Sequence, residues 1–484
     1  MNNDLNQATF SFFIADKKNE RYANAYFLDS AQLWLGYTSN TTVLYEKNDE
    51  VEVVVIGLCI DSHGEYSRNE IPSLLLQDVF SDAFKAYRFC DRFAGKYCIY
   101  YSRSGKTYMW GDATCSLPIA YYYEKNAIAI SNTEQMIALK YGFKESIEAM
   151  KIMKGSSSSQ PLPNNITLFD EIQILLPNHI LSFYDGNSYR IPISAVTADK
   201  STIDRICANT LDLINNIIEQ YRIYYNCIFP LTAGTDSRTI VSLFSKVEAS
   251  IECFTYKHSN FDEKTPDIKI PRDICAEMNY SYYIIPDIHA PYEYTKKTRD
   301  ILGSNFEDTV VDLAYTYNSV FKNRAFINGD IIDQIGKSLI GNNIPSFFAT
   351  SRFFQCKLHN HYKGTRAELN KYLNEIRLNK EKKHVFDLFA VENRCCRWGT
   401  QSDSVLCLFG ITSLNIFNCR EVINEWIRIP RKKRVNLILH KYYIAKSNPK
   451  LLDYSFNPGD WTDVFKRNWI LFYIATFIKH FIDR

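Results

Sequence analysis

The chain has 484 residues, 46% hydrophobic and 23% charged, which is the composition of a globular protein long enough for two or three domains. Its net charge of +2 provides no long-range attraction to nucleic acid, so a nucleic-acid partner is not expected. Thirteen cysteines without paired zinc-ligand spacing, and a start without a secretory signal pattern, predict a reducing, cytoplasmic setting.

The first third of the chain consists of short runs rich in β-branched and aromatic residues, separated by Asn, Asp, Gly and Ser. The predicted strands are 8–14, 25–27, 32–37, 52–60, 97–101, 107–110, 119–123, 127–131, 172–176 and 179–183. Helices are predicted near 72–80 and 132–141, and the Ser- and Pro-rich tract 154–163 predicts a flexible loop. This pattern indicates a mostly antiparallel domain of two sheets.

After residue 192 the pattern changes to helices that alternate with short strands. A long amphipathic helix is predicted over 202–220, followed by strands at 227–231, 251–256 and 282–285 with helices between them. This alternation predicts a parallel sheet whose ligand lies at the carboxyl ends of the strands. Beyond about residue 338 the sequence is largely helical.

The loop after the strand 227–231 reads Thr232-Ala233-Gly234-Thr235-Asp236-Ser237-Arg238. Its small residues let the backbone approach a phosphate, and the helix start behind it favours an anion. Asp236 is of the residue type that holds magnesium beside phosphate oxygens. The alternative is an ordinary strand-to-helix turn capped by Thr235, Asp236 or Ser237.

A second polar loop, 328–338, follows an apolar strand at 325–327. Asp330 and Asp333 are three residues apart and would point the same way on a starting helix turn. We therefore predict that Asp333 completes a magnesium site with Asp236 and that Asp330 handles a proton. The alternative is a helix start enriched in acids because of its dipole.

The last apolar stretch, 469–478, is too short to span a bilayer. It predicts a packed helix, and association with a membrane surface is the alternative.

Taken together, the two loops, in this order and behind a strand-rich first third, resemble the asparagine synthetase family over the whole chain. That family's first loop reads Ser-Gly-Gly-x-Asp-Ser, and 232–237 matches it with two conservative departures. Its second motif reads Gly-Glu-Gly-Ala-Asp-Glu; Gly329, Asp330 and Asp333 agree with it, whereas Ile331, Ile332 and Gln334 depart. The stretches 91–101, 111–122 and 166–182 look like the family's glutaminase-type half.

The resemblance implies an α/β fold with two domains. Residues 1–192 would form an N-terminal two-sheet αββα glutaminase-like (Ntn-type) domain. Residues 193–484 would form a PP-loop (adenine nucleotide α-hydrolase-like) domain with a parallel sheet and a helical extension. Family members that hydrolyse glutamine use a cysteine at position 2, where this chain has Asn2, so we predict no glutaminase activity.

The resemblance also implies a function, namely an ATP-dependent ligase that adenylates a carboxylate and lets ammonia or an amine displace AMP. The substrate would be a sugar acid of a surface polysaccharide or, alternatively, the carboxylate of a lasso-peptide or β-lactam-type cyclisation. A non-catalytic nucleotide-binding protein is a second alternative. A third alternative is another kind of enzyme that uses such a loop, for example a transfer-RNA thiolase or NAD synthetase. It has no support, because no basic surface or cysteine pair accompanies the loop in this chain.

Roles follow from the resemblance by position, with ATP and Mg²⁺ as the implied cofactors. The catalytic residues would be Asp330 and, late in the chain, Lys441, and the metal ligands Asp236 and Asp333. The nucleotide would contact Leu231, Thr232, Ala233, Gly234, Thr235, Asp236, Ser237, Arg238, Thr255, Tyr256 and Gly329. Three alternatives stay open: Arg238 as a salt-bridged surface residue, Tyr256 as a core residue and Lys441 as an exposed helix lysine.

Overall fold

The computed structural model describes residues 5, 7–124, 127–156, 162–193, 195–248, 250–258, 260–286, 288–304, 306–321, 323–458 and 468–482. Asn2 and residues 157–161 of the predicted flexible loop lie outside these ranges. No helix of the described residues is long and apolar enough to cross a bilayer.

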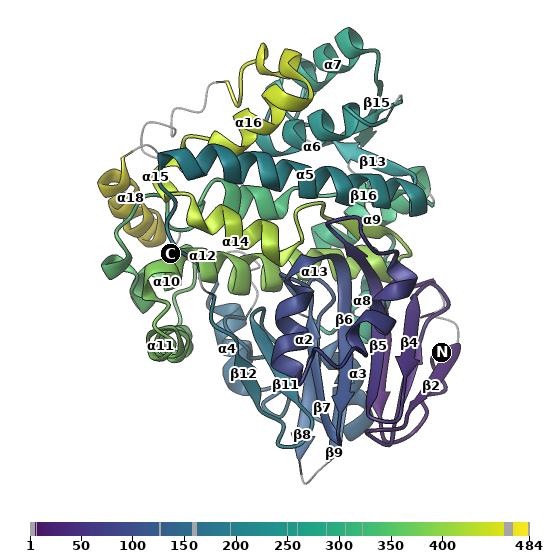
Figure 1. Cartoon of the computed structure of the whole chain (residues 1–484). Coiled ribbons are helices and arrows are strands. Elements are labelled where there is room, and N and C mark those ends of the chain that lie inside the picture. Colours follow the sequence, from purple (N-terminus) through teal and green to yellow (C-terminus); the bar gives the residue numbers. More distant parts are fainter. Residues whose placement is uncertain are drawn as a thin grey trace.

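The first part of the chain forms two six-stranded antiparallel sheets, drawn in purple and blue in Figure 1. The first has the order β10-β8-β9-β1-β3-β2 and the second the order β12-β11-β7-β6-β5-β4. The strands are β1 (Phe12–Ala15), β2 (Asn24–Leu28), β3 (Leu33–Tyr37), β4 (Val43–Lys47), β5 (Val51–Asp61), β6 (Phe93–Arg103), β7 (Lys106–Gly111), β8 (Ala120–Glu124), β9 (Ala127–Ser131), β10 (Gln173–Ile174), β11 (His179–Ser182) and β12 (Ser188–Arg190).

Alternating side chains place these sheets between two pairs of helices. Phe12 and Ile14 of β1 point into the core between the sheets, whereas Phe13 and Ala15 pack outward with the residues of α3 (Glu134–Tyr141) and α4 (Ile147–Lys154). On the other sheet, β5 and β6 pack outward against α1 (Ile71–Leu75) and α2 (Ala83–Phe89). The result is the predicted order of layers, helices on two sheets on helices.

The second part contains a five-stranded parallel sheet with the order β15-β14-β13-β16-β17. Its strands are β13 (Cys227–Pro230), β14 (Glu252–Lys257), β15 (Ser281–Pro286), β16 (Ala325–Ile327) and β17 (Thr412–Leu414). The helices between them are α6 (Thr235–Ser245), α7 (Pro266–Met278), α8 (Tyr292–Leu302) and α9 (Asp308–Val320). The structure thus combines two antiparallel sheets and one parallel sheet, as predicted.

Helices join the two parts and extend the second. The long helix α5 (Lys200–Tyr224) packs against β5 and against α14 (Arg420–Arg428) and α16 (Ile438–Ser447) (Figure 1). Further helical segments are α10 (Ser351–Lys357), α11 (Lys363–Leu378), α12 (Val385–Phe389), η6 (Ala390–Gly399), α13 (Thr400–Leu408), α15 (Arg431–Val435) and α18 (Trp469–Ile482), and six short turns, η1 (Arg68–Glu70), η2 (Cys90–Arg92), η3 (Ile332–Gly336), η4 (Ser346–Phe348), η5 (Lys382–His384) and η7 (Pro449–Leu452), are also helical. The predicted boundary at residue 192 falls between β12 and α5, and one core cluster runs from the antiparallel sheets to the parallel one.

Several element predictions differ from the structure. The strand predicted over 8–14 starts only at Phe12, because Phe10 has a left-handed φ of 55° that interrupts an extended chain. The helix predicted over 72–80 ends at Leu75, and the strand predicted over 172–176 spans two residues. The elements β4, α2, α4, β12 and β17 were not predicted; β4 is half exposed and β12 and β17 have only three residues each, which weakens their patterns.

Candidate functional site

The two polar loops lie side by side because the strands that precede them are neighbours. β13 pairs in parallel with β16, so the loop 231–238 and the loop 328–338 both emerge at the carboxyl edge of the sheet. After β13 the next strand of the sheet is β14, on one side, and after β16 it is β17, on the other side. The chain therefore leaves these two neighbouring strands in opposite directions. Ligands of open α/β sheets bind at such a switch point.

Close packing of the loops depends on Gly329. A Cβ atom on this residue would lie 3.2 Å from Cδ1 of Ile240 and 3.3 Å from Cβ of Asp236. Both distances are tighter than ordinary van der Waals contact, so a larger residue here would push the second loop away from the start of α6. Leu231 fixes the first loop from below, because its N–H donates to the carbonyl of Phe254 at 2.8 Å.

Side chains of the protein itself take up the N–H groups at the tip of the first loop. The N–H of Thr232 donates to Oγ of Ser237 at 3.1 Å, and that of Gly234 donates to Oγ1 of Thr232 at 3.1 Å. The N–H of Ala233 donates to Oδ1 of Asp267 at 2.8 Å. A carboxylate oxygen thus occupies one position that a phosphate oxygen would need.

Within this capped loop, the hydroxyl of Thr235 is buried and has no hydrogen-bond partner among the described residues. Thr235 is the first residue of α6 and Gly234 its N-cap, so this hydroxyl lies at the helix start, where the positive end of the dipole favours an anion. The loop therefore combines a capped turn with one donor left over.

Asp236 and Asp333 converge on one cation, Lys337, which sequence analysis did not single out. Lys337 Nζ lies 3.2 Å from Oδ1 of Asp333 and also pairs with Oδ2 of Asp236. On the other side, Nε2 of His440 donates to Oδ1 of Asp236 at 2.8 Å. We call Asp236, Asp333, Lys337 and His440 the loop ion cluster.

Burial and the neighbouring charges act in opposite directions on the pKa values of the loop ion cluster. Burial alone would raise the pKa of Asp236, but the hydrogen bond from His440 and the charge of Lys337 outweigh it and hold this pKa below its usual value. Burial and the neighbouring charge of Asp236 raise the pKa of Asp333. Burial would lower the pKa of Lys337, yet the two carboxylates raise it, so the ammonium stays charged.

Asp330 has a different environment. Burial, together with the charges of Asp403, Asp333 and Asp236, raises the pKa of Asp330 to about 7. It lines a polar cavity of about 20 Å³, enough for one water molecule, between the second loop and the antiparallel sheets. A carboxyl group that titrates near neutrality beside a water-sized cavity is suited to proton transfer.

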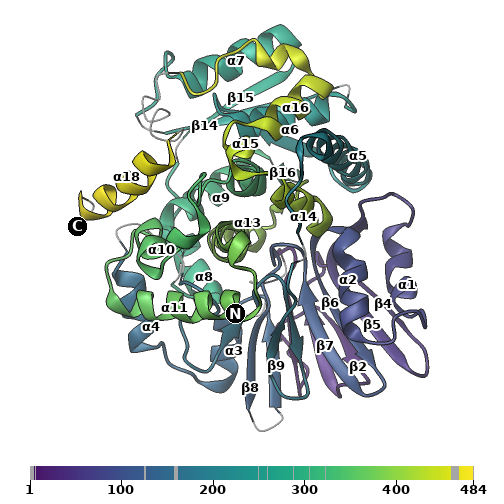
Figure 2. The same cartoon turned by 60° about the vertical axis from the view of Figure 1, so that its left-hand side comes forward.

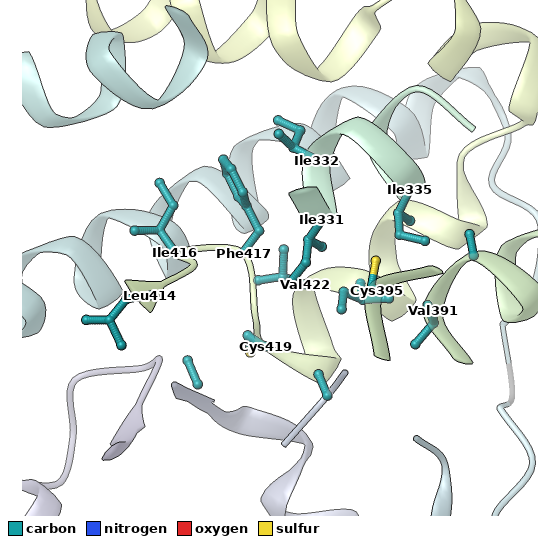
Figure 3. Close-up of a cluster of buried hydrophobic side chains, with 14 of the residues drawn as sticks. Ile331, Ile332, Ile335, Val391, Cys395, Leu414, Ile416, Phe417, Cys419 and Val422 are labelled. Atoms are coloured by element: carbon teal, nitrogen blue, oxygen red, sulfur yellow. The ribbon is translucent and has the colours of Figure 1, made fainter. Parts of the chain in front are cut away.

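Of the three residues of the second loop that depart from the motif of the resembled family, Ile331 and Ile332 belong to the apolar core, whereas Gln334 is buried and donates to Oδ2 of Asp333 at 2.9 Å. Ile331 and Ile332 are buried, and Figure 3 draws them with Ile335 among apolar partners from η6 and from 414–422. Their side chains take no part in the loop ion cluster. Where the resembled family has small residues, Ile331 and Ile332 therefore add contacts to the core. Asp333 is still free to face Lys337.

In the structure Arg238 is not the salt-bridged surface residue of the alternative interpretation, because it pairs with backbone carbonyls and with no carboxylate among the described residues. Its side chain is fully buried, and the guanidinium donates to the carbonyls of Tyr454 at 2.7 Å, Ala233 at 2.9 Å and Ser455 at 3.1 Å. It also lies 4.3 Å above the ring centre of Phe456. Arg238 thus ties the loop to the chain after α16, and burial lowers its pKa to about 10.

Thr255 and Tyr256, predicted to contact adenine, lie at the end of β14. The hydroxyl of Thr255 donates to the carbonyl of Leu231 at 2.6 Å and accepts from Tyr282 at 2.8 Å, so it holds the first loop in place. Tyr256 is half buried and packs against the apolar cluster below β14, as its alternative interpretation expects. Thr255 has no donor left for a nucleotide.

Lys441 does not reach the two loops. It is exposed on α16, whereas its neighbour His440 is fully buried and contacts Asp236. The helix turns successive residues by about 100°, so only one of the two can face the loop ion cluster. One signal for Lys337 was present in the sequence, because it follows Asp333 by four residues, a spacing at which opposite charges pair on helical turns.

The donor set suits a hard cation. Asp236 and Asp333 offer carboxylate oxygens, which magnesium prefers, and both reach the position of Lys337 Nζ. Among the described residues, no group of three or more His, Cys, Asp or Glu side chains forms a metal site. All thirteen cysteines lie in described ranges, are buried and form no disulfide.

Comparison with protein-family models and with curated protein sequences gives no match. Among solved structures, the chain is similar to glutamine phosphoribosylpyrophosphate amidotransferase from B. subtilis complexed with ADP and GMP. The TM-score is 0.21 and the sequence identity 8%, over 58% of this chain and 60% of that one. The chain therefore spans less than two thirds of that structure, and a similarity this low does not establish the family or the function.

Proposed function

We propose that the protein is an ATP-dependent ligase of asparagine synthetase type that adenylates a carboxylate, releases pyrophosphate and transfers the acyl group to ammonia or an amine. The observation that supports it is the convergence of Asp236 and Asp333, from two loops at the switch point of a parallel sheet, on one cation position. Adenylation suits such a site because a carboxylate is a poor electrophile until it carries a good leaving group.

In this proposal the first loop binds phosphate, and the aspartates of the two loops bind magnesium or transfer a proton. The N–H groups of the first loop and the hydroxyl of Thr235 would bind phosphate oxygens, with Asp267 and Ser237 released from the N–H groups they now accept from. Asp236 and Asp333 would hold magnesium, which when bound neutralises charge on phosphate oxygens. Asp330, with its pKa near 7, would take the proton from the attacking amine.

Lys337 takes the place in this account that Lys441 held in the sequence-based prediction. A lysine on a flexible stem can leave the carboxylates when a metal arrives and remain near the phosphates as a positive charge. Its ammonium would then stabilise the negative charge that develops on the transferring phosphate.

Pyrophosphate release tests the proposal. Purified protein would be given ATP, magnesium, ammonia and a panel of hexuronic acids and peptides, and pyrophosphate would be measured. We expect Asp236→Asn to lower the release rate by about 100-fold or more, the scale of losing one preorganised charge at a reacting phosphate. Asp308→Asn, an exposed acid on α9, is the matched control and should keep the wild-type rate. Equal rates for wild type and Asp236→Asn would contradict the proposal.

The ion pairs themselves favour a second candidate, a non-catalytic protein that has kept the fold. Lys337 fills the cation position between the carboxylates, and Asp267 accepts from the loop where phosphate would bind. In this case no carboxylate and amine would give pyrophosphate, and Lys337→Met would not change that result. Restored or raised turnover in Lys337→Met would exclude this candidate.

A further inference from the structure

Helix α18 presents an apolar face to solvent. Ile470, Ile474 and Ile478 are 50%, 48% and 53% exposed, and their spacing of four residues places them on one side of the helix. The other exposed apolar residues of this face are Leu471, Phe481 and Ile482. A helix that only covers a protein core turns polar residues toward solvent. An apolar face of this size on the exposed side of α18 therefore indicates a further binding partner.

The apolar face is not the side by which α18 packs on the protein. The opposite side stacks on α10, with the rings of Tyr473 and Phe353 parallel within 4° and their centres 5.5 Å apart. Lys357 Nζ lies 4.0 Å from the ring centre of Phe472. In Figure 2, α18 lies at the edge of the molecule and ends at the C-terminus, away from the sheets. The aromatic side holds the helix, and the aliphatic side remains available.

A basic cavity adjoins the C-terminal end of this face. It has a volume of about 210 Å³, and its lining includes Arg352, His361, Lys363, Arg366, His480 and Phe481. No carboxylate is part of the lining, and none of the described carboxylates pairs with Arg352, Lys363 or Arg366. Glu148 of α4, an acid that contacts α11 near this cavity, accepts from the hydroxyl of Tyr362 at 2.9 Å and is 4.0 Å from Lys151.

Two histidines add donors to this cavity. The rings of His361 and His480 are stacked with centres 4.1 Å apart. Both ring nitrogens of His361 are buried and have no hydrogen-bond partner among the described residues. Buried polar atoms without a partner next to three cations are matched by an anion with several acceptor oxygens, such as a phosphate group.

We propose that α18 and this cavity form a docking surface for an anionic lipid membrane. The apolar face, with Ile474 and Ile478 at its centre, would enter the boundary between headgroups and acyl chains, and the cavity would hold a lipid phosphate. Phe481 joins the two parts, because it is 55% exposed on the apolar face and also lines the cavity. An apolar helix face flanked by cations is the pattern of helices that lie in a membrane interface.

The residue types favour a membrane over a protein partner. The centre of a protein interface is enriched in Tyr, Trp, Met and Arg, whereas the exposed face of α18 consists of isoleucines with one leucine and one phenylalanine. The basic residues of the cavity lie at one end of the apolar face, and the exposed Lys479 lies at its border. Positive charges at the edge of an apolar face can contact the headgroups of an anionic membrane. This inference does not depend on the proposed ligase activity.

Cosedimentation with vesicles tests the docking surface. The full chain would be mixed with vesicles of phosphatidylcholine plus phosphatidylglycerol and with vesicles of phosphatidylcholine alone. We expect binding to the mixed vesicles only. Ile478→Asn should weaken it about tenfold, the effect of losing one buried aliphatic side chain. Lys363→Ala should weaken it about fivefold, the effect of one cation near an anionic surface.

Matched variants keep this test specific. Ile223→Asn replaces an isoleucine that is 73% exposed on α5, and Lys371→Ala replaces an exposed lysine of the same helix as Lys363. Both should bind the mixed vesicles like wild type. Equal binding to both kinds of vesicle, no binding to either, or equal weakening by the matched variants would overturn the proposal. So would a dimer in sedimentation velocity that Ile478→Asn abolishes, because a second copy would then cover the face.

Discussion

Two groups of carboxylates in this protein each surround one cation, and they differ in burial and in the kind of cation. In the Arg190 cluster (Arg190, Glu375, Glu381 and Glu392), the guanidinium lies 2.5 Å from Glu381, 2.7 Å from Glu392 and 3.5 Å from Glu375. The side chains of Arg190, Glu381 and Glu392 are at most 2% exposed. In the loop ion cluster, Lys337 and Asp236 are 19% and 21% exposed.

The difference separates a permanent tie from an exchangeable one. Arg190 lies on β12. Of the glutamates it pairs with, Glu375 lies on α11, Glu392 lies on η6 and Glu381 lies between these two helices, so the cluster joins the antiparallel sheets to the helical part. A planar guanidinium that binds two carboxylates away from solvent, as Arg190 binds Glu381 and Glu392, has no route to exchange, although the third acid, Glu375, is 35% exposed. Lys337 is reached by water and sits on a flexible stem, so another cation can replace it.

The largest expected effect tests the permanent tie. Arg190→Ala should lower the free energy of unfolding by about 3–5 kcal/mol, because Glu381 and Glu392 would remain buried without a counter-charge. Urea denaturation near neutral pH measures it. Arg299→Ala removes a half-exposed arginine that pairs with the exposed Asp308 at 3.0 Å, and it should cost less than about 1 kcal/mol. Similar losses in both variants would contradict the comparison.

The next effect concerns Asp330, an acid beside the loop ion cluster whose pKa the charge of Arg394 lowers less than burial and three neighbouring acids raise it. Its pKa is raised to about 7, so between about pH 4 and pH 7 the folded chain keeps a proton that the unfolded chain has lost. The wild type should therefore lose stability relative to Asp330→Asn as the pH rises through this window, by about 4 kcal/mol over the three units. The difference should then level off at higher pH.

Urea denaturation of wild type and Asp330→Asn at about pH 5 and about pH 8 measures this change. The asparagine keeps the shape of the side chain, so the comparison isolates the charge. A difference in unfolding free energy that is the same at both pH values would show that Asp330 ionises without penalty in the folded protein.

Sequence patterns predicted the backbone of the site better than its side chains. The runs 227–231 and 325–327 are apolar and end in small or acidic residues, so both strands, and the loops after them, were predicted where the structure has them. The alternation of strands and helices places the carboxyl ends of the parallel strands on one edge, but the pairing of β13 with β16, which is not the next strand in the sequence, is seen only in the structure. The two antiparallel sheets of the first part also follow from the short alternating strands, whereas only one helix of each covering pair, α1 and α3, was predicted.

The roles of individual cations could not be predicted, because they depend on segments distant in the sequence. Arg238 is fixed by the carbonyls of Tyr454 and Ser455, more than 200 residues later, and no local pattern shows that these would come near. Lys337 lies at the end of a loop, where a lysine is expected to be exposed to solvent, so its contact with Asp236 could not be predicted. Which of His440 and Lys441 faces Asp236 depends on how α16 rotates against α6, which packing decides.

A smaller effect tests whether Lys337 is exchangeable. Lys337→Met should lower the free energy of unfolding by about 1 kcal/mol or less, since the ion pairs are partly exposed and Asp236 keeps its bond from His440. Magnesium should then stabilise this variant more than wild type, because the two carboxylates no longer have a cation. Thermal unfolding with and without magnesium measures both.

Lys371→Met is the control for this experiment. Lys371 pairs with Glu368 at 2.8 Å on the surface of α11, and its loss should leave the response to magnesium unchanged. If magnesium stabilises wild type and Lys337→Met equally, the two aspartates do not form an exchangeable cation site, and the loop ion cluster is a permanent tie like the Arg190 cluster.

The smallest expected effect, that of Lys441→Ala, is best seen beside a change at its neighbour on α16. Lys441 is exposed, so Lys441→Ala should change the free energy of unfolding by less than about 0.5 kcal/mol. His440 is fully buried, and His440→Ala should cost about 1–3 kcal/mol because Asp236 loses the donor to Oδ1. The same pair should differ in pyrophosphate release, if it occurs, since only His440 touches the loop ion cluster. A larger loss of rate in Lys441→Ala would show that α16 turns when substrates bind, bringing to the phosphates the lysine that the sequence resemblance selected.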